Sequence, residues 1–189
     1  MSRMPSKPNA SLVDLLLDYP EFTRPLHDFA QVLFRGEAPF SAGEREMLFA
    51  YASAHNQCDF CRTVHTQVAE NLDIEKGLVD DLVADPDLAR APDKLRPVLR
   101  FVAKLNRDMT AVGDADVQAI FDAGWDERAF MYATLLACQA AFYNRWVEAL
   151  GVTAEPSQVA KAAGALAEHG YAGINAMLDD PEVRKQAGY

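Results

Sequence analysis

The chain has 189 residues and a formal net charge of −10 at pH 7; half of its residues are apolar and three are cysteines. This composition predicts one globular domain with a sizeable core. The acidity and the lack of a basic cluster argue against a nucleic-acid partner. No apolar run approaches the ~20 residues of a membrane helix, and no signal-peptide core is present, so we expect a cytoplasmic protein without a membrane partner.

Residues 1–10 are polar and predict a flexible N-terminal arm, followed by a single domain over residues 11–189. In a reducing compartment, a closely spaced cysteine pair is more often redox-active or metal-binding than a structural disulfide. The three cysteines therefore predict a redox-active or metal-binding site and not a disulfide scaffold.

Two helices are predicted before the cysteines. Residues 12–19 form a short apolar segment that Pro20 should end. Thr23 is the expected N-cap of a helix over residues 24–35, and Gly36 is its expected stop.

The segment around the first two cysteines predicts a helical hairpin. Ser41 and Glu44 form an S-x-x-E capping box, which indicates a helix that starts just after Ser41. The polar residues 55–57 break this helix. A second helix should follow over about residues 58–72, with its inner residues at i+3 and i+4 spacing.

Four reactive side chains converge in this hairpin: Glu46, Cys58, Cys61 and His65. Glu46 and His65 lie about equally far from the turn on opposite arms, so antiparallel packing should bring them together. Cys61 is one helical turn from His65, roughly 6 Å by the helix rise. Both cysteines should lie in the first helical turn, where free N–H groups and the helix dipole favour thiolates. We expect His65 to take the proton of Cys61, directly or through a water, and Glu46 to orient the imidazole.

The rest of the chain also has helical patterns and no alternating pattern that predicts a strand, so the fold class is an all-α helical array. Further helices are predicted over residues 75–84, 93–109, 114–123, 127–150, 157–169 and 171–178, with Asp126 and Ser157 as N-caps. The helix over 127–150 is apolar on nearly every face. It should be central or covered by another subunit, and we expect a homo-oligomer.

Three patterns resemble a known superfamily: Glu-x11-Cys-x2-Cys-x3-His, the preceding Ser-x-Gly-Glu-Arg-Glu, and the later Phe-Tyr-Asn-Arg-Trp-Val-Glu-Ala-Leu-Gly-Val. They are similar to the carboxymuconolactone decarboxylase-like superfamily, in particular its alkylhydroperoxidase (AhpD-like) and peroxidase-related branch. The resemblance covers about residues 40–152. It implies an all-α, oligomeric protein without a bound cofactor that reduces hydroperoxides through the CxxC. A partner protein or a small thiol, such as a dihydrolipoyl group, would then reduce the disulfide.

By motif position, the resemblance assigns catalytic roles to Glu46, Cys58, Cys61 and His65. Cys61 would attack the peroxide, and Cys58 would resolve the oxidised sulfur as a disulfide. The best-studied members of the branch carry a further histidine just before the second cysteine, where this chain has Phe60.

Besides a purely structural or inert pair, two alternatives remain open for the CxxC. Cys58, Cys61 and His65 could be zinc ligands, although structural zinc usually has four ligands and no second Cys/His pair is spaced for it. The pair could also be a switch in a redox-sensing or stress-response protein that does not turn over substrate. Phe60, in place of the family's histidine, keeps this second alternative open.

Two features of the long apolar helix complete the predictions. Cys138 is interpreted as a small core residue. Asn144 and Arg145 are interpreted as structural or subunit-contact residues, because an arginine inside an apolar helix needs a buried acidic partner or an interface.

Overall fold

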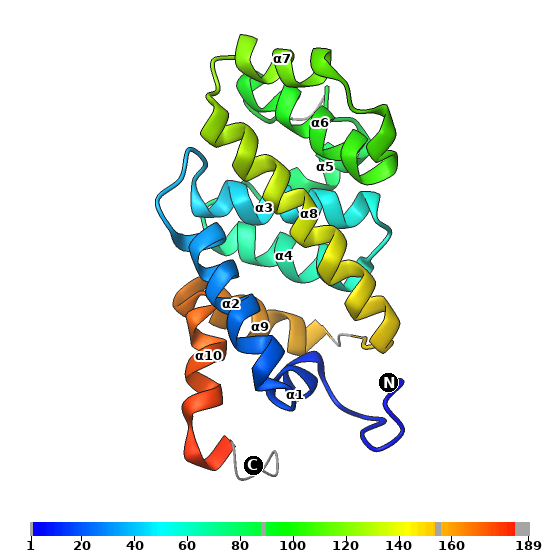
Figure 1. Cartoon of the computed structure of the whole chain (residues 1–189), viewed down its shortest axis with the longest axis vertical. Coiled ribbons are helices and arrows are strands. Elements are labelled where there is room, and N and C mark those ends of the chain that lie inside the picture. The colour runs from blue at the N-terminus through cyan, green and yellow to red at the C-terminus, as the bar shows by residue number, and fades with distance from the viewer. Residues whose placement is uncertain (1, 88–89, 154–155, 184–189) are drawn as a thin grey trace.

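The structure is a computed structural model and describes residues 2–87, 90–153 and 156–183. Within these ranges all regular secondary structure is helical, which confirms the all-α prediction (Figure 1). The elements are α1 (Leu12–Leu17), α2 (Pro20–Arg35), α3 (Ala42–His55), α4 (Asp59–Asn71), α5 (Leu78–Ala84), η1 (Asp93–Leu95), α6 (Arg96–Arg107), η2 (Met109–Ala111), α7 (Asp114–Asp122), α8 (Glu127–Leu150), α9 (Pro156–His169) and α10 (Ala172–Asp179). Among the described helices, none is both long and apolar enough to cross a membrane.

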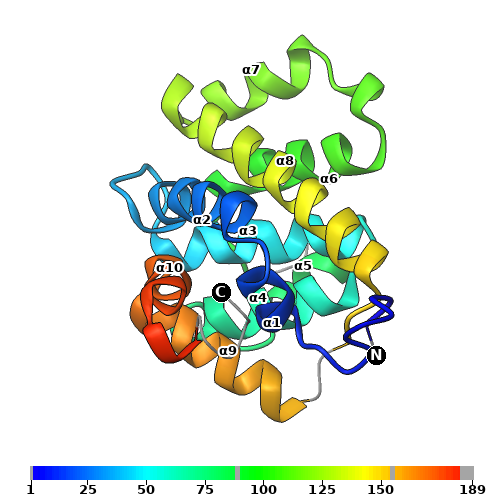
Figure 2. The ribbon, with the colours of Figure 1, turned by 60° about the horizontal axis from the view of Figure 1, so that its bottom comes forward.

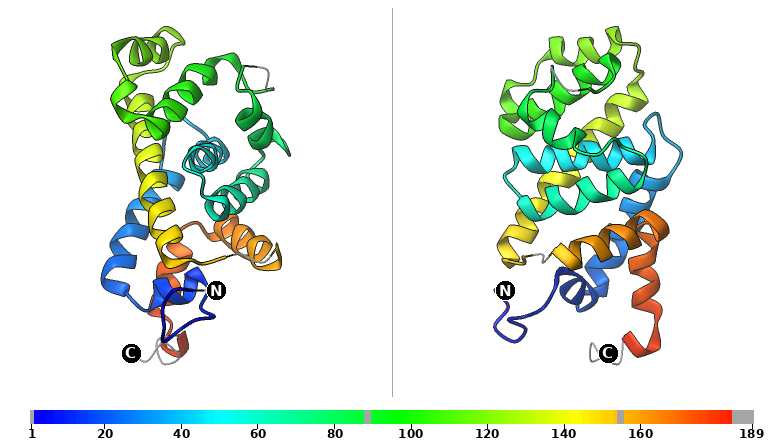
Figure 3. Two further views of the ribbon diagram at one scale, coloured as in Figure 1. Left: turned by 90° about the vertical axis from the view of Figure 1, so that its right-hand side faces the viewer. Right: turned by 180° about the vertical axis from the view of Figure 1, so that it is seen from behind.

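The α3–α4 hairpin lies across the middle of the molecule. In Figure 1, α5, α6 and α7 lie above it, and α1, α2, α9 and α10 lie below it. Helix α8 crosses the front of the hairpin diagonally in Figure 1, and the left view of Figure 3 shows it packed along one side of the molecule, beside the hairpin. Figure 2 shows α9 and α10 on the side of α4, and α9 packs directly on α4. The hairpin is therefore enclosed on several sides.

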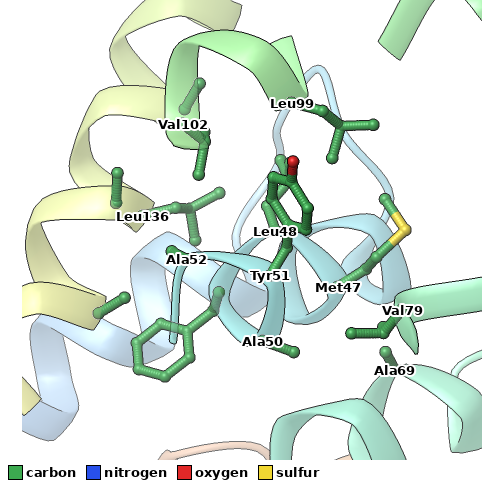
Figure 4. Packing of buried hydrophobic residues seen from close by; sticks show 14 of the residues in the cluster. Met47, Leu48, Ala50, Tyr51, Ala52, Ala69, Val79, Leu99, Val102 and Leu136 are labelled. Atoms are coloured by element: carbon green, nitrogen blue, oxygen red, sulfur yellow. The ribbon is translucent and has the colours of Figure 1, made fainter. Parts of the chain in front are cut away.

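Helix α3 is the centre of the core. Its Met47, Leu48 and Tyr51 are almost completely buried and pack beneath α6 and beside α8 (Figure 4). Leu99 of α6 and Leu136 of α8 close over them. Each such side chain contributes about 1.5–3 kcal/mol by its burial, so the first arm of the hairpin is firmly held.

The turn between α3 and α4 is a Schellman motif. The backbone N–H of Cys58 donates to the carbonyl of Ser53, and that of Gln57 donates to Ala54, both at 3.0 Å. Gln57 takes the left-handed conformation, with φ of 61°. The chain thus reverses within a few residues, so that Cys58 becomes the N-cap of α4 and Cys61 lies in its first turn.

Gly43 lets the open ends of the hairpin approach each other. A Cβ added there would lie 2.3 Å from the backbone oxygen of Leu72. We expect Gly43→Ala to lower the free energy of unfolding by about 2 kcal/mol, because the two helices must shift apart. The matched control is Gly164→Ala in α9, where a Cβ meets nothing within 4 Å; it should raise stability by about 1 kcal/mol. Urea unfolding measures both, and a stabilised Gly43→Ala protein would contradict this account.

Two predicted helix starts are wrong. Helix α2 begins at Pro20, because a proline fits the first helical turn, where its missing N–H needs no partner. Thr23 therefore lies inside the helix, and its hydroxyl donates to the carbonyl of Leu16 at 2.6 Å. Helix α9 begins at Pro156 for the same reason, so Ser157 is not its N-cap.

The predicted N-terminal arm contains no helix over residues 2–10. The backbone N–H of Arg3 donates to the carbonyl of Leu150 at 2.7 Å, and its side chain donates to the carbonyl of Glu148 at 2.8 Å. The arm thus contacts the end of α8, and its flexibility stays a prediction.

Candidate redox site

Glu46 and His65 meet across the hairpin, as the antiparallel arrangement predicted. Oε2 of Glu46 lies 2.6 Å from Nδ1 of His65. The neighbouring Ala50 and Ser53 are completely buried, and such small side chains let the two arms come close. Since Nδ1 is engaged, Nε2 is the ring nitrogen left for a proton-transfer partner.

Glu46 is completely buried and has two partners that the sequence analysis did not identify. Nη1 of Arg35 lies 2.7 Å from Oε1 of Glu46. The hydroxyl of Tyr171 lies 3.4 Å from both carboxylate oxygens, and burial raises the pKa of Tyr171 well above its usual value. Arg35 compensates the buried charge, and Tyr171 remains a protonated donor. These residues come from α2 and from the start of α10, outside the hairpin.

Cys58 and Cys61 are free thiols that lie 3.3 Å apart, and both are buried. A hydrogen bond from the thiol of Cys61 is the main cause of a lowered pKa at Cys58. The same hydrogen bond, followed by burial, raises the pKa of Cys61. When the pair loses one proton, the negative charge therefore lies on the sulfur of Cys58. The attacking role of Cys61 stays a prediction.

His65 forms no hydrogen bond with either cysteine in the part of the chain that the structure describes. Its ring instead packs on Phe49, with the ring centroids 4.1 Å apart. Of the two expected routes for the proton, the route through a water molecule is the one that fits this geometry.

Two polar residues of α8 influence the thiols electrostatically: Glu148 acts against the lowered pKa of Cys58, and Asn144 acts against the raised pKa of Cys61. Asn144 is buried and is fixed by the end of α3: it donates to Ser53 at 3.0 Å and accepts from Asn56 at 2.9 Å. The interpretation of Asn144 as a structural residue agrees with these two hydrogen bonds but did not include its influence on the thiol of Cys61.

Arg145 lies away from the site. It is exposed and donates to the carbonyl of Ala141 in its own helix at 2.8 Å. A guanidinium in contact with solvent needs no buried acidic partner, so only the asparagine of this Asn-Arg pair is part of the buried interior.

Solved structures share this arrangement of helices. An uncharacterised peroxidase-related protein from Silicibacter sp. TM1040 matches with a TM-score of 0.68 and 23% identity, over 74% of this chain and 73% of that chain. An uncharacterised peroxidase-related protein from Ralstonia eutropha JMP134, described as an alkylhydroperoxidase AhpD core, matches with a TM-score of 0.68 and 21% identity, over 74% of each chain. This chain has the AhpD-like fold. No protein-family model matches the sequence, and no curated protein does.

In this AhpD-like fold, the prediction that Cys138 is a core residue is wrong, because Cys138 is exposed. Apolar residues cover nearly every face of α8, so their spacing does not indicate which face is buried. Cys138 lies on the outer face, with exposed Met131 and Phe142 on the same helix.

We expect mild oxidation to join Cys58 to Cys61 and to leave Cys138 as a free thiol. The first two lie 3.3 Å apart, so a disulfide needs only a small adjustment. Exposed Cys138 should react with iodoacetamide in the folded, oxidised protein, and peptide mass spectrometry will identify both products. A disulfide that contains Cys138 as the main product would overturn this prediction.

The described residues contain no cluster that could hold zinc: among them, no group of three or more His, Cys, Asp or Glu side chains is placed to bind a metal ion. Nδ1 of His65 is engaged by Glu46, and the cysteines contact each other. The arrangement around the AhpD-like hairpin is that of a thiol pair next to a carboxylate–imidazole pair.

Proposed function

We propose that the chain is a thiol-dependent hydroperoxidase or disulfide reductase of the AhpD-like type, which acts in the cytoplasm without a bound cofactor. The observation that carries this proposal is the pair of free, buried thiols 3.3 Å apart at the start of α4. A pair formed by the buried Glu46 and the partly buried His65 on the same hairpin supports proton transfer. The peroxidase-related descriptions of the two structural neighbours point to the same general class.

The proposed reaction uses the two sulfurs in turn. The thiolate of Cys61 attacks the terminal oxygen of a hydroperoxide, the O–O bond breaks, and the departing alkoxide takes a proton from His65 through a water. Cys61 is then a sulfenic acid. Cys58 attacks its sulfur, water leaves, and the disulfide forms. A dihydrolipoyl-type thiol or a partner protein returns the pair to two thiols by exchange, while Glu46 stabilises the charged imidazole.

The test is steady-state peroxide consumption with a panel of thiol reductants that includes dihydrolipoamide. Wild type should consume peroxide at least about 10²-fold faster than Cys61→Ser, because the variant lacks the attacking sulfur. Cys138→Ser is the matched control and should keep the wild-type rate, since this thiol lies on the outer face of α8. Equal rates for wild type and Cys61→Ser would exclude the peroxidase.

A second candidate is a redox-sensing protein whose CxxC changes its assembly without turnover. Phe60 favours it, because an aromatic ring stands where the best-studied relatives place a further histidine. The burial of both sulfurs also restricts the approach of a substrate. Oxidation that changes the particle size while the peroxide assay shows no turnover would identify the sensor.

We expect the protein to form a homo-oligomer. Large apolar side chains are exposed on two neighbouring helices, α2 and α8: Phe22, Phe29, Val32, Met131 and Phe142. Burying such a face in a subunit contact removes apolar area from water. Light scattering at micromolar concentration should give a mass above the 20.8 kDa of one chain, and Phe142→Glu should reduce it. A monodisperse wild-type monomer would refute the prediction.

A further inference from the structure

A cleft of about 450 Å³ lies between α3, the end of α5 and α6. Its lining includes Tyr51 and His55 of α3, Val83 of α5, and Arg100, Lys104 and Arg107 of α6. A volume of this size is typical of small-molecule sites. The described residues that line the cleft do not include the two thiols of the CxxC, Glu46 or His65, so the cleft is separate from the candidate redox site.

Arg107 differs from the other two cations of the cleft in its partners. Nζ of Lys104 lies 2.7 Å from Asp116, and Arg100 forms an ion pair with Asp87. Among the residues that the structure describes, no carboxylate forms an ion pair with Arg107, although this side chain is exposed. A guanidinium is a planar group with five N–H donors, and it binds a carboxylate through two parallel hydrogen bonds. Arg107 is therefore available to an anion from solution.

Two neutral side chains stand next to Arg107. Nδ1 of His55 accepts from Nε of Arg107 at 3.2 Å. Burial and, to a smaller extent, Arg107 lower the pKa of His55 to about 4, so the ring is neutral at pH 7 and its hydrogen is on Nε2. The ring of Tyr51 lies 4.5 Å from that of His55 and points from α3 towards α6 (Figure 4). Burial raises the pKa of Tyr51, so its hydroxyl keeps its proton.

These neutral groups have hydrogen-bonding capacity to spare. Neither Nε2 of His55 nor the hydroxyl of Tyr51 forms a hydrogen bond with another described residue. Together with the guanidinium of Arg107, they make this part of the cleft rich in donors. An acceptor that carries a negative charge fits such a site better than a neutral one, because hydrogen bonds to a charged group are the stronger ones.

Two carboxylates also line the cleft and restrict the kind of anion that fits. Asp85 accepts from the backbone N–H of Asp87 at 2.8 Å, and Asp108 accepts from that of Thr110 at 3.0 Å. Both stay charged beside any ligand and would repel a dianion such as phosphate more than a monoanion. The one guanidinium without a carboxylate partner compensates a single negative charge. The charges therefore favour a monoanion.

The cleft also has apolar surface for the rest of a ligand. Val83, Ala84, Pro86 and Ala103 contribute to its lining. Val83 is 37% exposed, so part of this surface is in contact with water. An apolar body that covers it gains free energy by removing that area from water.

We propose that this cleft binds a small organic carboxylate. The guanidinium of Arg107 holds the carboxylate group, the hydroxyl of Tyr51 donates to it, and the apolar body of the ligand covers Val83 and Pro86. This binding does not depend on the chemistry of the cysteines. Since Arg107 contacts His55, the last residue of α3, the ligand lies next to the turn that leads to Cys58.

Isothermal titration calorimetry of the full chain at low salt tests the site, with hexanoate as the probe. Wild-type protein should bind hexanoate with a Kd of about 1 mM or lower. Arg107→Gln should weaken the binding at least about tenfold, because it removes the charged donors. Arg107 is exposed, so this variant should fold. Tyr51→Phe keeps the buried ring, removes only the hydroxyl, and should weaken the binding about threefold.

The matched control is Arg145→Gln on α8, which makes the same change at another exposed arginine. It also detects binding of the probe to the exposed apolar side chains of α8, such as Met131 and Phe142. Its affinity should equal that of wild type. Two further ligands define the chemical class. 1-Hexanol has the same apolar body without the charge, and inorganic phosphate has charge without the apolar body. Both should bind more weakly than hexanoate.

Four results would overturn the proposal. One is a wild-type affinity for hexanoate weaker than about 1 mM. Another is equal binding by wild type and Arg107→Gln, which would place the probe elsewhere on the molecule. Binding of 1-hexanol as tight as that of hexanoate would reduce the cleft to an apolar surface. Binding of phosphate tighter than that of hexanoate would reject the carboxylate as the ligand.

Discussion

Replacing Glu46 with glutamine is expected to lower the free energy of unfolding by about 3–5 kcal/mol, the usual cost of removing one partner from a buried ion pair. Glu46 is completely buried, and the side chain of its partner Arg35 is only 13% exposed. In the variant, the guanidinium of Arg35 stays in the core without a countercharge. His65 and Tyr171 lose a charged acceptor at the same time. Urea unfolding followed by circular dichroism measures the difference.

Glu44→Gln is the matched control for this substitution. Glu44 lies on the same helix, near its start, where its side chain accepts from the backbone N–H of Ser41. A glutamine can make the same contact, so the free energy of unfolding should change by less than about 0.5 kcal/mol. A second control is the double variant that combines Arg35→Met with Glu46→Gln. It should recover part of the loss, since neither charge of the Arg35–Glu46 pair remains. Equal stability of Glu46→Gln and Glu44→Gln would show that the ion pair is unimportant.

The hairpin was predictable from sequence because its signals act over short distances. The capping box of Ser41 and Glu44 starts α3 as predicted. Asp126 caps α8, and Gly151 ends it in the left-handed conformation. Each of these residues satisfies backbone groups within a few positions, so the local pattern contains the whole interaction.

The remaining partners of the site depend on tertiary packing. Arg35 and Tyr171 reach Glu46 from helices that the hairpin sequence does not specify. Asn144 could be recognised as unusual, since it is a polar residue in an apolar helix, but its hydrogen bonds to Ser53 and Asn56 require the position of α8 against the hairpin. The error at Cys138 has a related cause, because a helix that is apolar all round does not indicate its buried face.

His65→Asn should slow the reaction of Cys61 with alkylating agents by about 10²-fold or more, the usual contribution of general-base assistance. Glu46 holds Nδ1 of the imidazole at 2.6 Å, so Nε2 is left to accept a proton through a water. Asparagine cannot be protonated at neutral pH. Without this acceptor, the pH dependence of alkylation should move to higher pH. The measurement is the alkylation rate against pH in a Cys138→Ser background.

The Glu46–His65 contact predicts how the two substitutions combine. If both residues act as one unit, Glu46→Gln should slow alkylation by a similar factor, and the double variant should be little slower than the slower single variant. Circular dichroism must show each variant folded at the assay temperature, because Glu46→Gln also loses stability. Independent roles would instead give effects that multiply. A pH profile that is unchanged in His65→Asn would mean that Glu46 and His65 only stabilise the hairpin, and that the proton of Cys61 leaves by another route.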